Sequence, residues 1–379
     1  MGDRSSMESV EESESNRRGG ESVDPDLPAV PPVDGAAERA ALERQPTLTK
    51  PPGSLGRLED LAVAIAGLVG APRPELAEAT VVVAAGDHGV VDRGVSAYPQ
   101  AATRAMLENF LEGGAAINAI AGAVDAETLV VDAGIAGNPV PGALDVRIDR
   151  GTDDASSAPA MSRRDAVAAI DAGLRIASEE LADADVVALG EMGIGNTTIA
   201  AAITAALTEA SPGEATGHGT GIDDGELDHK VAVVEEMLET SALDANEQAA
   251  NEQDASARVD DAIDVLAGVG GFEVGVLAGV AIGCAADRTP VVVDGAISGA
   301  AALLADALEP DVRPFLLPSH AGVEPACAIQ LDALGLEPLF AYDLRLGEGT
   351  GACLALPIYR SACATLRGMA TFEDIGLAE

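Results

Sequence analysis

The sequence predicts an α/β fold in which a parallel β-sheet is flanked by helices, in the three-layer manner of Rossmann-like proteins. Short β-rich apolar runs alternate with Ala-rich helical stretches, and most of the runs end in a Gly-containing turn. Strands that alternate with helices form βαβ units, and such units form parallel sheets. The predicted strands are 80–85, 128–131, 185–189, 290–293 and 314–317, with helices at 197–207 and 272–286 among them. Because ligands bind beyond the carboxyl ends of parallel strands, we expect the site in the turns that follow the strands.

The two ends of the chain are predicted to form a smaller helical domain beside an α/β domain of residues 76–350. Residues 36–75 form its N-terminal segment, in which a proline-containing turn separates two stretches of helical spacing. Residues 351–379 form its C-terminal segment, which is helical again. The predicted helices are 36–45, 57–69 and 352–369.

Two segments differ from the rest in composition. Residues 1–35 are rich in Ser, Glu, Gly and Pro and are predicted to be a disordered acidic tail. Residues 240–260 are rich in Asn, Gln, Glu, Asp and Ala. We expect this stretch to be a polar insertion or a loosely held surface helix without a catalytic role.

The charge of the chain is unusual. It has 63 acidic and 22 basic residues, a net charge of −41, and only two lysines, Lys50 and Lys230. The apolar fraction of 47% is too high for disorder along the whole chain, so the charge predicts a folded protein with a carboxylate-rich surface. Such a surface suits a salt-rich cytoplasm, where ions screen its self-repulsion. It argues against nucleic acid or an anionic membrane as a partner.

Neither a metal site nor a membrane segment is predicted. The four cysteines have no metal-ligand spacing and are expected to be small buried residues. His88, with Asp87 and Asp92 nearby, could suggest a metal ligand, but a hydrogen-bonded turn histidine is favoured. The N-terminus lacks the apolar core of a secretory signal, and no apolar run is long enough to span a membrane.

The first turn that could bind a ligand is Gly190–Thr198, which follows a predicted strand and begins a predicted helix. Its glycines allow successive N–H groups to face an anion, and the helix N-terminus adds partial positive charge. A phosphate is the natural ligand, although an ordinary turn with Asn196 or Thr197 as helix cap is also consistent with this sequence. The turn matches neither the P-loop nor the dinucleotide fingerprint, which argues against an NTPase or a dehydrogenase.

The second turn, 346–352, holds Glu348 between two glycines. A carboxylate beside an apolar ligand is partly desolvated, which raises its pKa toward that of a general base. A solvated turn carboxylate is the alternative. In the third turn, 217–224, Lys230 follows within two helical turns and could reach a phosphate, or could be a surface lysine. The Ser96–Gln100 segment could line a base pocket or merely cap the following helix.

Seven stretches of the chain, taken together, resemble the nicotinate-nucleotide–dimethylbenzimidazole phosphoribosyltransferases, in the order found in that family. The match spans residues 40–375. It does not include the predicted tail, 1–35, or the polar insertion, 240–260. The stretches are LTKPPGSLGRLEDLA (48–62), GDHGVVDRGVSAYPQAAT (86–103), NFLEGGAAIN (109–118), GEMGIGNTTIAAAI (190–203), GTGIDD (219–224), VVVDGAISGAAALL (291–304) and LRLGEGTGACLALP (344–357).

The resemblance implies transfer of the phosphoribosyl group of nicotinate mononucleotide to 5,6-dimethylbenzimidazole, in the assembly of the lower ligand of cobalamin. It implies Glu348 as the general base, and Glu191 is our candidate for stabilising an oxocarbenium-like transition state. It also implies a homodimer, with small molecules as substrates and no cofactor or metal.

The resemblance also assigns residues to the two substrates. The phosphate and ribose are expected at Gly193, Gly195, Asn196, Thr197, Gly219, Lys230 and Gly349, and the base at Ser96, Tyr98, Gln100, Met192 and Leu346. The chain departs from the family in two places: His218 stands where an Arg is expected, and Ala321-Gly322-Val323 replace a more basic segment. These departures bear on phosphate affinity and on the preferred base.

Two alternatives remain open from the sequence. One is the same transfer to another flat acceptor, such as adenine or a phenol. The other is a non-catalytic nucleotide-binding protein of the same fold, which the presence of Glu348 and Lys230 disfavours.

Overall fold

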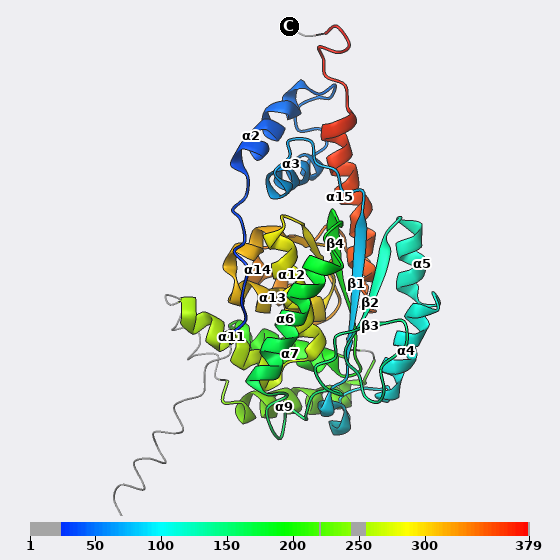
Figure 1. Cartoon of the computed structure of the whole chain (residues 1–379), viewed down its shortest axis with the longest axis vertical. Coiled ribbons are helices and arrows are strands. Elements are labelled where there is room, and N and C mark those ends of the chain that lie inside the picture. The colour runs from blue at the N-terminus through cyan, green and yellow to red at the C-terminus, as the bar shows by residue number, and fades with distance from the viewer. Residues whose placement is uncertain (1–23, 220, 244–254, 378–379) are drawn as a thin grey trace, which may run out of the picture.

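A six-stranded parallel sheet forms the centre of the protein (Figure 1). The computed structural model describes residues 24–219, 221–243 and 255–377; for residues 255–259 it describes the backbone alone. The strands are β1 (Ala79–Gly86), β2 (Glu127–Gly134), β3 (Leu144–Asp145), β4 (Val186–Met192), β5 (Val291–Val293) and β6 (Leu316–Pro318). The predicted parallel fold is thus confirmed. All five predicted strands are present, and only the two-residue β3, too short to show a pattern, was missed.

The strand order β3-β2-β1-β4-β5-β6 places the first strand in the middle of the sheet. The chain builds outward from β1 through β2 to β3, then returns to the other side of β1 with β4. Loops after β1 and β4 therefore leave the sheet in opposite directions. This switch point is where α/β sheets bind ligands.

Helices cover both faces of the sheet. α4 and α5 lie against one face with the first half of α15, and α12 and α13 lie against the other, where α6 covers α12 (Figure 1). The helices are α2 (Gly35–Arg44), α3 (Arg57–Val69), α4 (Ala101–Leu111), α5 (Ala116–Ala123), α6 (Arg163–Glu179), α7 (Asn196–Leu207), α8 (Pro212–Ala215), α9 (Asp224–Thr240), α11 (Ala255–Val269), α12 (Phe272–Ala286), α13 (Ala296–Leu308), α14 (Pro325–Leu334) and α15 (Thr350–Gly368).

α12 is buried along almost its whole length, because its own residues, apart from Glu273, carry no charge or polar group on any side of the helix. Its approach to α6 depends on glycines. A Cβ at Gly173 would clash with the carbonyl oxygen of Val276, and a Cβ at Gly279 would clash with that of Ile170. The small residues of this sequence thus replace large aromatic side chains as the means of filling the core.

A second, smaller hydrophobic cluster joins α2 and α3 to the last turns of α15. It consists of Ala41, Leu48, Ala62, Ala66, Ala362 and Leu366. The Arg44 guanidinium reinforces it by donating to the carbonyl oxygens of Leu366, at 2.7 Å, and Met369, at 3.1 Å. α15 also contributes Leu356 and Tyr359 to the main core. One helix therefore serves both cores, which the predicted boundary at residue 351 does not reflect.

The predicted tail is shorter than residues 1–35. Residues 24–34 lie against the folded protein: Val30 is buried, and Arg288 Nη2 donates to the carbonyl oxygen of Pro32 at 2.9 Å. Asp34 then caps α2. The composition of this segment suggested disorder because composition does not reveal contacts with residues far away in the sequence, such as Arg288. Residues 1–23 lie outside the described residues, as do residues 244–254 of the predicted polar insertion.

All four cysteines are buried, as expected for small apolar residues. Within the described ranges, none of the helices combines the length and hydropathy that a membrane-spanning segment needs.

Candidate functional site

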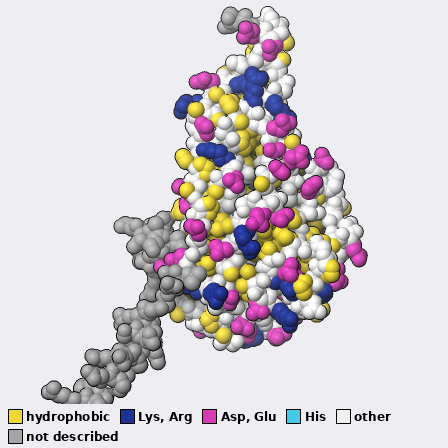
Figure 2. Space-filling view, in the orientation of Figure 1, with side chains coloured by type: hydrophobic (Ala, Val, Ile, Leu, Met, Phe, Trp, Pro, Cys, Tyr) yellow, Lys and Arg dark blue, Asp and Glu magenta, His cyan; other side chains and the backbone are white. Residues whose placement is uncertain are grey.

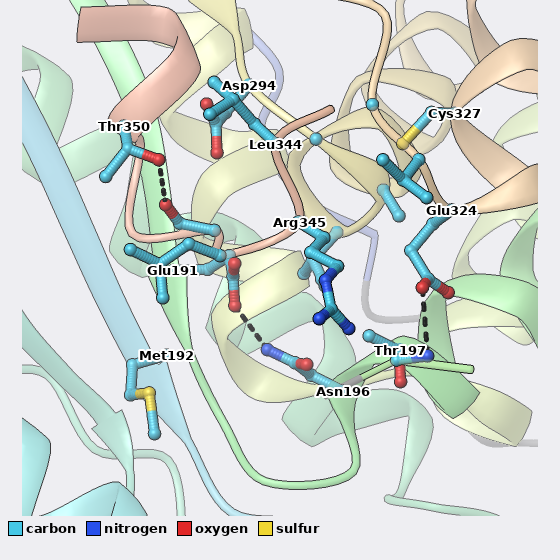
Figure 3. A pocket seen from close by; sticks show the side chains of 18 of the residues that line it. Glu191, Met192, Asn196, Thr197, Asp294, Glu324, Cys327, Leu344, Arg345 and Thr350 are labelled. Atoms are coloured by element: carbon cyan, nitrogen blue, oxygen red, sulfur yellow. Dashed lines mark hydrogen bonds between the residues drawn. The ribbon is translucent and has the colours of Figure 1, made fainter. Parts of the chain in front are cut away.

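A cleft lies at the carboxyl ends of β4, β5 and β6, beside the switch point of the sheet (Figure 3). It encloses about 700 Å³ of space that opens to solvent. Turns that follow the strands form its walls, together with the first turn of α7 and the segment before α15. Its lining includes Glu191, Met192, Gly193, Ile194, Asn196, Thr197, Gly219, Asp294, Gly295, Ala296, Ile297, His320, Gly322, Val323, Glu324, Cys327, Leu344, Arg345, Leu346, Gly347 and Thr350.

The turn between β4 and α7 forms the floor of this cleft. Gly193 has no room for a side chain, because a Cβ would lie 2.5 Å from the carbonyl oxygen of Gly86. Gly195 has φ 89°, a left-handed conformation that favours glycine. Asn196 then begins α7, and its N–H donates to the carbonyl oxygen of Gly193 at 3.1 Å. Among the described residues, the N–H of Thr197 in the first helical turn has no backbone partner and can serve a ligand in the cleft. This arrangement is suited to an anion.

Two buried carboxyl groups stand beside the turn. Glu191 accepts a hydrogen bond from Asn196 Nδ2, and the two side chains point toward each other (Figure 3). Burial, and then the nearby carboxyl groups of Asp294, Glu273 and Glu348, raise the pKa of Glu191 to about 8. Burial also raises the pKa of Asp294 to about 7, although N–H groups including that of Ala352, at 2.8 Å, favour its ionised form. At neutral pH Glu191 is therefore largely protonated.

Glu348 lies in a strained loop between the cleft and α5. Gly347, Glu348 and Gly349 all have positive φ, and Glu348 is the non-glycine residue among them, at φ 62°. Its carboxylate is buried and accepts the N–H of Ile117 at 3.3 Å. Burial raises the pKa of Glu348, with this hydrogen bond acting in the opposite direction. The side chain does not itself line the cleft, which its neighbour Gly347 does.

Lys230 is fully buried behind the floor of the cleft. Its Nζ donates to Thr197 Oγ1 at 2.8 Å and to the carbonyl oxygen of Gly217 at 3.0 Å. Burial lowers its pKa to about 8, while Glu324 acts to raise it. Glu324 in turn accepts the N–H of Gly219 at 2.9 Å. Lys230 thus fixes two walls of the cleft to each other and adds positive charge beneath them.

A buried ion pair supports the same turn from the other side. His88 Nε2 lies 3.0 Å from Glu273 Oε1, and both side chains are fully buried. Burial lowers the pKa of His88, but the Glu273 carboxylate outweighs this effect, and the net shift is upward. His88 is therefore a structural ion-pair partner, buried more deeply than the turn histidine that the sequence suggested. In the described part of the chain, no three His, Cys, Asp or Glu side chains form a metal-binding group.

Comparison with known proteins places this geometry in a family. A family model described as "Phosphoribosyltransferase" matches residues 30–377. Relatives named nicotinate-nucleotide–dimethylbenzimidazole phosphoribosyltransferase include one from Desulforamulus reducens, 47% identical, covering 91% of this chain and 96% of its own. Another, from Roseiflexus sp., is 48% identical and covers 92% and 95% of the two chains. A crystal structure of the enzyme of that name from Thermus thermophilus superposes with a TM-score of 0.82 at 41% identity, covering 91% of this chain and 99% of the other.

The chain belongs to the nicotinate-nucleotide–dimethylbenzimidazole phosphoribosyltransferase family. The structure brings together, in one cleft, half of the site residues that the sequence analysis proposed. Those that line the cleft are Glu191, Met192, Gly193, Asn196, Thr197, Gly219 and Leu346. Those that do not are Glu348, Gly349, Gly195, Lys230, Ser96, Tyr98 and Gln100.

The Ser96–Gln100 segment lies apart from the cleft lining. Ser96 Oγ accepts the N–H of Tyr98 at 3.3 Å, and the Tyr98 side chain is 54% exposed. Gln100 precedes α4 but makes no capping hydrogen bond. Thr103, on α4, instead links this region to the site, because its Oγ1 accepts the N–H of Ile194 at 3.1 Å. The assignment of Ser96, Tyr98 and Gln100 to the base therefore stays a prediction.

The structure adds five polar residues that the sequence analysis did not propose for the site. They are Asp294, His320, Glu324, Arg345 and Thr350. Asp294 directly follows a predicted strand and His320 is the third residue after another, so strand ends alone could have indicated them. Arg345 is exposed, and its guanidinium points toward Asn196 and Thr197 (Figure 3). His218, the residue at the expected Arg position, instead lies outside the cleft lining with its Nε2 2.9 Å from Asp224 Oδ1.

Proposed function

We propose that this protein transfers the 5-phosphoribosyl group of nicotinate mononucleotide to 5,6-dimethylbenzimidazole, releasing nicotinate and forming α-ribazole 5′-phosphate for the lower ligand of cobalamin. The observation that supports this proposal best is that an anion-binding turn and two buried carboxyl groups share one cleft in a chain of this family. The alternatives of another acceptor base or a non-catalytic protein are outcomes of the test below.

We assign the phosphate to the floor of the cleft. The N–H groups of Gly193 and Thr197 and the Thr197 hydroxyl lie at the start of α7, where the helix N-terminus stabilises an anion. Lys230 reinforces this position from behind, and Arg345 can approach it from the opposite wall. Lys230 is thus a supporting cation in our proposal, one layer further from the phosphate than the sequence suggested.

We assign the proton transfer to Glu348. Its carboxylate takes the N–H proton of the benzimidazole, and the lone pair of the other ring nitrogen attacks C1′ of the ribose. The C1′–N bond to nicotinate breaks, and its electron pair neutralises the cationic ring nitrogen. Attack from the face opposite to the leaving group inverts C1′, which accounts for the α-linkage. A raised pKa makes Glu348 a better base than an exposed carboxylate.

The two buried carboxyl groups complete the proposal. The donor carries a cationic ring, and a nearby cation favours ionised carboxylates. Binding of the donor therefore releases protons from Glu191 and Asp294 and provides negative charge where C1′ becomes cationic. Both groups are held by hydrogen bonds before the substrate arrives, so little reorganisation is required.

We also propose that the protein works in a salt-rich cytoplasm, as a homodimer. The net charge of −41 supports the first part, since a surface of this kind is stable only when ions screen it. The proposal of a homodimer rests on the family resemblance.

The test is an assay of nicotinate release from nicotinate mononucleotide in concentrated KCl, with dimethylbenzimidazole in one series and adenine in another. Release that depends on dimethylbenzimidazole is the expected result. Release with adenine alone would change the acceptor and keep the chemistry. Absence of release with either base, from protein with a native circular dichroism spectrum, would contradict the proposed activity.

A further inference from the structure

We propose that His320 binds the phosphoribosyl donor, with its Nε2 accepting a hydrogen bond from a hydroxyl group of the ribose. This inference rests on the proposed function, since it assigns a role within the same cleft. It concerns a residue that the sequence did not select.

The ring of His320 is fixed with one edge toward the protein and the other toward the cleft. A Cβ at Gly351 would clash with Nδ1 and Cε1, so the backbone of α15 packs against that edge. Phe340 stacks on the ring with centroids 6.0 Å apart and planes inclined by 18°. On the opposite edge, Nε2 is 3.6 Å from the Cβ position of Gly322, and both residues line the cleft.

The hydrogen bonds of Ser319 determine which nitrogen carries the proton. Ser319 Oγ lies 2.6 Å from the carbonyl oxygen of Val293 and 3.2 Å from that of Asp294. Carbonyl oxygens only accept, and a hydroxyl has a single proton, so that proton is directed to Val293. At the 3.0 Å contact with His320 Nδ1, the Ser319 oxygen must therefore accept, and Nδ1 must donate.

Neutral His320 therefore has a free lone pair on Nε2. Burial lowers the pKa of His320, which favours this neutral form. Asp294 does not change the assignment, because its Oδ1 is 4.0 Å from Nδ1 and already accepts the N–H of Ala352. Among the described residues Nε2 has no hydrogen-bond partner, so the cleft presents an oriented acceptor.

The chemistry of the substrates limits what this acceptor can bind. The phosphate and the nicotinate carboxylate are anionic and largely deprotonated at neutral pH, and a lone pair repels them. The pyridinium ring has no N–H, and our proposal assigns the benzimidazole N–H to Glu348. The ribose hydroxyls are the remaining donors. The proposed assignments put the ribose between the phosphate at the start of α7 and the carboxyl groups of Glu191 and Asp294, in the cleft that His320 also lines.

Two variants separate the two nitrogens of the ring. His320→Asn can keep a donor near the Nδ1 position for Ser319 and has no group at the Nε2 position. His320→Gln can place its amide oxygen at the Nε2 position and restore the acceptor. Calorimetry measures the Kd of nicotinate mononucleotide and of its 2′-deoxy and 3′-deoxy analogues for wild type and both variants. Nitrogen NMR of the wild type, with His320 assigned by its loss in the variants, reports the tautomer.

We expect one deoxy analogue to bind wild type about 3- to 10-fold more weakly than the parent nucleotide, as for loss of one neutral hydrogen bond. His320→Asn should weaken binding of the parent by a similar factor and abolish the difference between the two ligands, and His320→Gln should restore it. An unchanged deoxy effect in His320→Asn would overturn the inference, as would a proton on Nε2 or a failure of the nucleotide to bind. Because binding and tautomer do not depend on turnover, failure of nicotinate release alone would count only against the proposed function.

Discussion

At the scale of single residues, burial determines the chemistry of this site. Glu191, Asp294 and Glu348 are ordinary carboxylates in the sequence, but burial in the folded protein removes water from each of them and raises their pKa values. Such shifts concentrate at functional sites because a group must change its charge during the reaction. Glu191 lies near the end of β4, Asp294 directly follows β5, and Glu348 lies just before α15.

Glu348→Gln should retain binding of nicotinate mononucleotide and lower kcat about 10²- to 10⁴-fold, because the amide keeps the shape and removes the base. Nicotinate release and calorimetric binding measure the two effects separately. Asp343→Asn is the matched control: Asp343 is an exposed carboxylate on the same segment, has a positive φ that Asn tolerates, and lies outside the cleft lining. Turnover of Glu348→Gln similar to that of the control would contradict the assignment.

Glu191 should make the stability of the protein depend on pH. A carboxyl group whose pKa rises from 4.5 to about 8 on folding keeps its proton in the folded state after the unfolded chain has lost it. The free energy of unfolding therefore decreases as the pH rises through this window, by at most about 1.4 kcal/mol per pH unit for one group. Glu191→Gln has no such proton, and its melting temperature should decrease less than that of wild type between pH 5 and pH 8.

The exposed Glu112 provides the control for this experiment. Glu112→Gln should follow the wild-type melting curve at every pH. Parallel curves for wild type and Glu191→Gln would show that the Glu191 pKa does not change on folding.

At the scale of secondary structure, glycines decide how closely the helices pack. Gly173 on α6 meets the backbone of α12, where a Cβ would clash with the carbonyl oxygen of Val276 and lie 2.7 Å from the amide nitrogen of Val280. Backbone atoms on a buried helix cannot move aside as a flexible side chain can. The distance between these helices therefore depends on the absence of one methyl group.

Gly173→Ala should destabilise the protein by about 1–3 kcal/mol, the usual effect of overpacking, although Ala is the better helix former. Gly122→Ala on α5 is the matched control, since its Cβ would meet nothing within 4 Å. It should stabilise the protein by up to about 1 kcal/mol. Denaturant unfolding of both variants measures the difference in the free energy of unfolding. Equal effects would show that α6 and α12 can move apart without loss of stability.

At the scale of the whole molecule, the surface charge is the dominant feature. Acidic side chains are spread over the face seen in Figure 2, with fewer basic groups among them. Self-repulsion of a net charge of −41 opposes the compact state. The ion pairs that the surface does make, such as that of Arg163 with Asp264 at 2.8 Å, are too few to balance it.

The melting temperature should therefore rise with KCl from about 0.1 M to about 2 M, as the screening length falls from about 10 Å to a few ångströms. Dialysis to low salt should reduce the helical signal in circular dichroism. NaCl at the same ionic strength should act similarly, whereas glycerol should not substitute for salt. A melting temperature that is independent of salt would contradict adaptation to a salt-rich cytoplasm.

Local pattern was sufficient for much of the fold and part of the site. The five apolar runs that form β1, β2, β4, β5 and β6 and the Ala-rich helices could be predicted directly, since apolar pattern and turn residues are local properties. The turn at Gly193 and Gly195 could be proposed as an anion site, because the requirement for glycine follows from backbone geometry. Motifs in family order then led to the family itself.

The sequence by itself determined the fold class and the family of this protein and indicated the turn that we propose for the phosphate, because each depends on short stretches of residues that are adjacent in the chain. Tertiary structure alone decided that Lys230 lies buried behind the cleft, that His88 pairs with the distant Glu273, and that His320 presents an oriented acceptor. It also decided that residues 24–34 are packed against the fold. The physical reason is that burial and hydrogen-bond partners come from segments far apart in sequence, and these partners determine charge, tautomer and exposure.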